Sequence, residues 1–106
     1  MAEAEFTWLN KQAVRHAAGY VVKSTGRFSM AYIESGRQIS VGVEYGYINS
    51  TQPCVEVGPG AFLHFDGATW LLPSDEQERI EKNFIAGCRF MGFEVVKYDP
   101  KPEDGG

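Results

Sequence analysis

Apolar and polar side chains alternate most regularly in residues 38–45. One side of an extended strand here carries Ile39, Val41, Val43 and Tyr45, and the other carries Ser40, Gly42 and Glu44. Side chains of a strand point alternately to opposite faces, so this pattern predicts an antiparallel sheet with one covered face and one solvated face. Shorter apolar runs predict further strands at residues 20–23, 28–34, 54–57, 62–65 and 93–98.

Turn residues separate these strands. Ser35 and Gly36 predict a two-residue hairpin turn, and the Gly-Pro-Gly run at residues 58–60 predicts another. Residues 46–53 are expected to form a polar loop.

The spacing of a helix occurs twice. Near the N-terminus, residues 8–18 carry an apolar stripe, with Thr7 as a suitable N-cap and Gly19 as a suitable end. The stripe consists of Leu9, Ala13, Val14 and Ala17. These features predict a short N-terminal helix.

The second helix is predicted to start at Ser74. Ser74 and Gln77 match a capping box, and the acidic residues that follow Ser74 suit the positive end of the helix dipole. The apolar stripe of this helix consists of Ile80, Phe84, Cys88 and Met91, and Gly92 closes it.

The order of these elements predicts an α+β fold. We expect a mainly antiparallel sheet of about five to six strands, with the long helix of the C-terminal half packed on one face and the short helix at the N-terminus. Residues 1–98 are expected to form a single domain, and residues 99–106 a flexible polar tail.

The charge of the chain argues against some classes of partner. The net charge is −4, and it is uneven: residues 44–106 hold five Lys or Arg against eleven acids, a balance of −6. Such a field repels a phosphate backbone, so nucleic acid is not expected as a partner. No apolar run approaches the roughly 20 residues of a membrane helix. The acidic start of the chain is unlike a signal peptide, which predicts a cytoplasmic protein with Cys54 and Cys88 as buried free thiols.

Few residues are arranged for chemistry. His64 and Asp66 are two apart and could form a base or part of a metal site, but the Asp66-Gly67 pair is typical of a turn. Zinc sites usually need three or four ligands in close pairs, and neither the two cysteines nor the two histidines form such a pair. We therefore predict no catalytic, cofactor-binding or metal-binding residues.

Exposed aromatic and acidic residues near turns are candidates for contact with a protein partner. Aromatic side chains are common anchors of protein interfaces, and an anionic patch suits a basic partner. The candidates are Glu44, Tyr45, Tyr47, Asp66, Trp70, Asp75 and Glu76. The same acids at Asp75 and Glu76 also stabilise a helix start, so a purely structural role stays open for them.

Several segments together resemble a known family. They are the run Tyr-Ile-Glu-Ser-Gly-Arg-Gln-Ile-Ser-Val at residues 32–41, then Glu44, an apolar strand ahead of Trp70, the acid-led helix from Ser74, and Phe-Glu-Val at residues 93–95. The chain is similar over residues 32–96 to the family numbered seventy-four among the bacterial polymorphic-toxin immunity proteins. The resemblance implies a small α+β domain that neutralises a cognate toxin by binding it.

Three functions follow as hypotheses. The first is a non-catalytic protein-binding domain, such as an immunity protein with a basic toxin domain as its partner. The second is a small ligand-binding domain or enzyme that uses the region of His64 and Asp66. The third is a structural homo-oligomer formed by pairing of exposed sheet edges.

Overall fold

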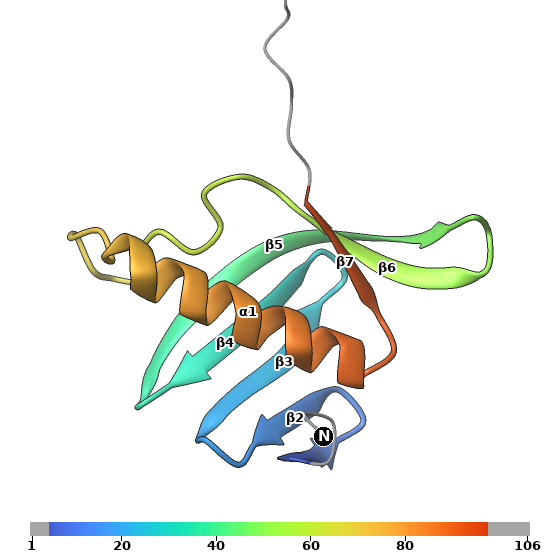
Figure 1. The fold of residues 1–106 in the computed structure, drawn as a ribbon, viewed down its shortest axis with the longest axis horizontal. Coiled ribbons are helices and arrows are strands. Elements are labelled where there is room, and N and C mark those ends of the chain that lie inside the picture. The colour runs from blue at the N-terminus through green and yellow to red at the C-terminus, as the bar shows by residue number, and fades with distance from the viewer. Residues whose placement is uncertain (1–4, 98–106) are drawn as a thin grey trace, which may run out of the picture.

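The computed structural model describes residues 5–97, which form a seven-stranded sheet and one helix (Figure 1). The elements in chain order are β1 (Phe6–Asn10), β2 (Ala13–His16), β3 (Tyr20–Gly26), β4 (Ser29–Glu34), β5 (Arg37–Ile48), β6 (Gln52–Val57), α1 (Ser74–Phe90) and β7 (Glu94–Lys97). The predicted α+β class is confirmed, with more strands than expected. The predicted polar tail lies outside the described residues.

The strands lie in the sheet in the same order as along the chain. Each pair of neighbours is antiparallel except β6 and β7, which are parallel. A parallel pair needs a crossover connection, and residues 58–73 together with α1 supply it. The long helix therefore lies across one face of the sheet, as predicted (Figure 1). We call this face the helix side and the opposite one the outer face.

The helix is held against the sheet by a continuous apolar core. Ile80, Phe84 and Cys88 of α1 are fully buried, and so is Val22 of β3. The helix comes closest to the sheet at Gly87, where an added methyl group would lie 2.6 Å from a methyl carbon of Val22. Burial raises the pKa of the Cys88 thiol to about 12, and Cys54 and Cys88 are both free and buried, as expected.

A polar network joins α1 to β4 at the edge of this core. The buried hydroxyl of Tyr32 donates to Glu34 over 2.5 Å and accepts from the Asn83 amide over 3.0 Å. Arg79 of α1 donates to both carboxylate oxygens of Glu34, over 2.9 and 3.0 Å. The Arg79 and Tyr32 hydrogen bonds hold the pKa of Glu34 below its ordinary value of 4.5, against the opposing effect of burial. The network fixes the helix against one strand.

The predicted helix at residues 8–18 is wrong, because β1 and β2 form a hairpin there. Leu9, which belongs to the supposed helical stripe, is 49% exposed and is the extra residue of a β-bulge. Strand spacing instead buries Phe6 and Val14, and Phe6 stacks on Phe90 of α1 with ring centroids 5.2 Å apart. A short helix has little stability of its own, so this aromatic and β-branched burial decides the structure.

The predicted capping box at the start of α1 is also wrong. Pro73 occupies the N-cap position, and no side chain caps the helix. Ser74 is already helical, so its hydroxyl is not in the position from which it could cap. Gln77 reaches back instead to the Leu72 carbonyl, over 2.8 Å.

The predicted strand at residues 62–65 is a loop. Phe62 and Phe65 lie three positions apart, which would put them on opposite faces of a strand, yet both enter the core. The loop closes on itself through a 2.8 Å hydrogen bond from the Leu72 N–H to the Leu63 carbonyl. The segment is therefore a loop whose phenylalanine side chains fill part of the core, and not a further strand.

The predicted polar loop at residues 46–53 is mostly a β-hairpin. β5 runs for 12 residues to Ile48, and the chain turns at Asn49 and Ser50, where φ is 54° and 64°. The hairpin turn predicted at Ser35 and Gly36 is confirmed, with φ of 54° and 77°.

Candidate protein-binding surface

The seven predicted contact residues do not form one surface. Glu44 lies on the outer face of the sheet, whereas Tyr45 and Tyr47 are on the helix side of the β5–β6 hairpin. Asp75 and Glu76 lie in the first turn of α1, Trp70 lies in the loop before it, and Asp66 lies against the edge of β5.

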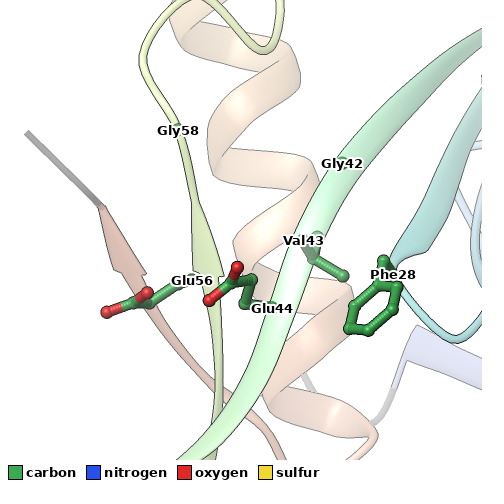
Figure 2. A pocket seen from close by; sticks show the side chains of 6 residues that line it. All are labelled: Phe28, Gly42, Val43, Glu44, Glu56 and Gly58. Carbon is green, nitrogen blue, oxygen red and sulfur yellow. The ribbon is translucent and has the colours of Figure 1, made fainter.

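A hollow of about 580 Å³ lies around Glu44, where β5 changes partner. Up to Gly42 the strand pairs with β4, and from Val43 onwards it pairs with β6. The hollow is lined by Phe28, Gly42, Val43, Glu44, Glu56 and Gly58 (Figure 2). A methyl group added to Gly42 or Gly58 would meet nothing within 4 Å, so the absence of side chains there leaves space beside the carboxylates.

Two carboxylate side chains border this hollow from neighbouring strands. Glu44 of β5 is the direct cross-strand partner of Glu56 of β6, and both are exposed. Figure 2 shows Glu44 extending from β5 towards β6 and Glu56 extending from β6 away from β5. Directly opposed residues have Cβ atoms about 4.5–5.5 Å apart, and like charges in such a pair destabilise the sheet. Within residues 5–97 neither carboxylate forms an ion pair.

Phe28 provides an apolar wall for the same hollow. It lies in the turn between β3 and β4, on the other side of β5 from the carboxylates (Figure 2), and its side chain is 62% exposed. Sequence reasoning placed Phe28 in a strand and missed this role. The sequence feature that could have indicated an exposed Phe28 was its position directly after Gly26 and Arg27, because the sheet does not cover a residue in a turn.

The two predicted tyrosines differ in exposure. Tyr45 hydrogen bonds to the Ser24 hydroxyl over 3.1 Å and packs edge-on against Phe93, with ring centroids 5.6 Å apart. Its contacts hold the β5–β6 hairpin against the rest of the molecule. Tyr47, two residues further along the strand, is 69% exposed and is the freer of the two.

Asp66 has a structural role at the edge of β5. Its carboxylate accepts from the Ser40 hydroxyl over 2.6 Å and from the Ser40 backbone N–H over 3.0 Å. These bonds hold the pKa of Asp66 below its ordinary value of 3.8. The neighbouring His64 ring lies 3.1 Å from the Phe65 carbonyl through Nδ1. No group of three or more potential metal ligands occurs in the described part of the chain.

Trp70 and Leu71 form a second exposed patch beside the acidic first turn of α1. Their side chains are 59% and 65% exposed. Asp75 and Glu76 lie in the first turn, and Glu76 comes within 3.8 Å of Arg79. Leu71 is an exposed apolar residue that sequence reasoning did not single out.

Among residues 5–97, the helix is too short and too polar to span a membrane. Comparisons with protein-family models, with curated proteins and with solved structures found no match.

Proposed function

We propose that this domain is a non-catalytic protein-binding module. Its partner places a lysine or arginine side chain in the hollow between Glu44, Glu56 and Phe28. The proposal is carried by the cross-strand pairing of two exposed carboxylates that lack a counter-charge among the described residues. A cation from a partner would relieve the repulsion between them, so the arrangement favours binding at some cost to folding.

The shape and composition of the hollow support a cationic side chain as its occupant. Lysine and arginine carry an apolar stem and a charged head. The exposed ring of Phe28 can cover such a stem or lie under a cation, while the carboxylates accept hydrogen bonds from the head. A volume of about 580 Å³ leaves ample room for such a side chain.

We further propose that the partner is a basic domain of a bacterial toxin, which this protein neutralises by covering it. The resemblance of residues 32–96 to an immunity-protein family supports this choice, and the resembling region includes both β5 and β6. The excess of acids in residues 44–106 would steer a basic domain towards this half of the chain.

The experiment is co-expression of the full chain with toxin candidates encoded beside its gene, followed by pull-down and a cell-survival assay. We expect one candidate to be captured and its toxicity suppressed. The double variant Glu44→Gln/Glu56→Gln should weaken capture by about tenfold or more, which corresponds to about 1.4 kcal/mol.

The matched control is Asp75→Asn/Glu78→Gln, which removes the same charge from the start of α1. It should bind like the unmodified chain. Equal weakening by both double variants would show that only net charge matters and would contradict the assignment to the hollow. Failure to capture or protect against any candidate would contradict the toxin-neutralising role.

A further inference from the structure

The outer edge of β1 lacks the features that usually keep a sheet edge from pairing. β1 is the first strand of the sheet, and no described residue pairs with its outer side. Its sequence, Phe-Thr-Trp-Leu-Asn, contains no charge and no proline. Edge strands of soluble proteins are normally protected by such residues or by a cover. The bulge at Leu9 limits the regular part of the edge to Phe6–Trp8 without closing it.

Two of the other free edges in the described residues are protected. The first half of β5 is covered by Asp66, whose N–H donates to the Gln38 carbonyl and whose carboxylate accepts from Ser40. The edge at β7 is short and carries Glu94 and Lys97 at its ends. Both are in ion pairs, with Arg89 and Glu81 respectively. β1 has neither kind of protection.

The backbone of β1 points its free groups outward at two positions. The Glu5 carbonyl accepts from the Ala17 N–H over 2.9 Å, so the backbone N–H and C=O groups of Glu5 point towards β2. The backbone N–H and C=O groups of successive residues in an antiparallel strand point in alternate directions. Those of Thr7 therefore also point towards β2, and those of Phe6 and Trp8 point away from it. Trp8 is 46% exposed, which leaves both its backbone and its ring open to a partner.

We propose that β1 pairs antiparallel with β1 of a second copy of this chain, about a two-fold axis at Thr7. In this dimer the outward backbone N–H and C=O groups of Phe6 form hydrogen bonds with those of Trp8 in the second copy. By symmetry, Trp8 forms the same hydrogen bonds with Phe6 of the second copy. The Thr7 side chain lies on the outer face, directly opposite Thr7 of the second copy. The two sheets continue as one across the axis.

The side chains around this axis complement one another. Trp8 lies opposite Phe6 of the second copy, and aromatic and Thr–Thr cross-strand pairs are both favourable. The open surface bordered by Trp8, Asn10 and Lys11 becomes covered.

Substitution at Thr7 tests this register, because the axis places residue 7 opposite itself. The mass of the full chain would be measured by sedimentation equilibrium from micromolar to millimolar concentration. We expect the unmodified chain to dimerise and both Thr7→Lys and Thr7→Glu to be monomers, since each puts like charges in contact. An equimolar mixture of the two variants should form a heterodimer, because lysine then faces glutamate.

The matched control is Thr51→Lys, an exposed substitution in the turn between β5 and β6 that should leave the dimer intact. Circular dichroism of each variant would show that it is folded. A monomeric unmodified chain over the whole range would overturn the proposal. So would a dimer that persists in both Thr7 variants, or variants that fail to associate when mixed.

Discussion

Gly87 is a residue at which the helix lies close against the sheet, and its side-chain size is limited by a single neighbour. The two nearest atoms to a methyl group built on Gly87 would be Cγ2 and Cβ of Val22, at 2.6 and 2.8 Å. Val22 is fully buried and cannot move aside freely. An interior position of a helix would ordinarily favour alanine over glycine, by about 1 kcal/mol. At this crossing the packing has the larger effect.

We therefore predict that Gly87→Ala lowers the free energy of unfolding by about 1–3 kcal/mol, as overpacked cores do. Urea unfolding followed by circular dichroism would measure it. Gly42→Ala is the matched control, because a methyl group there meets nothing within 4 Å, and it should not destabilise the fold. An unchanged or increased stability of Gly87→Ala would show that the helix lies further from the sheet than described.

At the scale of elements, α1 is joined to β4 by an ion pair as well as by the core. Glu34 is mostly buried, with 21% of its side chain exposed, while Arg79 is 46% exposed. The Tyr32 hydroxyl adds a further hydrogen bond, and burial together with Glu34 raises the pKa of Tyr32. The network determines which part of the helix lies over β4.

We predict that Glu34→Gln destabilises the protein by about 1–2 kcal/mol at neutral pH. Hydrogen bonds to charged groups are worth about 1.5–3 kcal/mol, and the exposure of Arg79 reduces this. The folded pKa of Glu34 lies below its ordinary value of 4.5, so its contribution is present above that value and is lost as the pH falls through the folded pKa. Urea unfolding of both chains at a series of pH values should show their difference shrinking on acidification.

The control is Glu94→Gln, which removes a more exposed carboxylate that also pairs with an arginine, Arg89. Its effect should be smaller at every pH. A Glu34→Gln variant whose deficit stays constant down to acidic pH would contradict the role assigned to the Glu34 charge.

The elements that were predicted from the sequence are those with a strong local pattern. Two patterns each fit only one kind of secondary structure, namely the alternation in residues 38–45 and the apolar stripe from Ile80 to Cys88. The strand and the helix that they predict are both confirmed. Residues 8–18 fit both a helix and a pair of strands, because their apolar stripe at helical spacing includes positions that strands can also bury. The contact of Phe6 with Phe90, which selects the hairpin, joins residues far apart in the chain and cannot be seen locally.

The candidate surface was predictable only in part for the same reason. Glu44 could be placed on the solvated face from the alternation alone. Its partner Glu56 and the Phe28 wall come from other strands, and their proximity depends on register. The hydrogen bond between Asp66 and the edge of β5 could not be predicted either, because it is also non-local.

At the scale of the whole molecule, the two faces of the sheet have different roles. The helix side contains the core, the Tyr32 network and the closest helix–sheet contact. The outer face carries the opposed carboxylates and the proposed binding hollow, and the proposed dimer edge at β1 lies several strands away from it (Figure 1). Binding of a partner and pairing of two copies can therefore occur together.

The central claim is that Glu44 and Glu56 are paired across β5 and β6 for binding and at a cost to folding, and it is tested without knowledge of the partner. The measurement is the free energy of unfolding of Glu44→Gln, Glu56→Gln and the double variant, treated as a double-mutant cycle. Each single variant should be more stable than the unmodified chain, by about 0.2–1 kcal/mol, and the double variant should gain nothing further. Single variants that are less stable, or gains that simply add, would contradict the account.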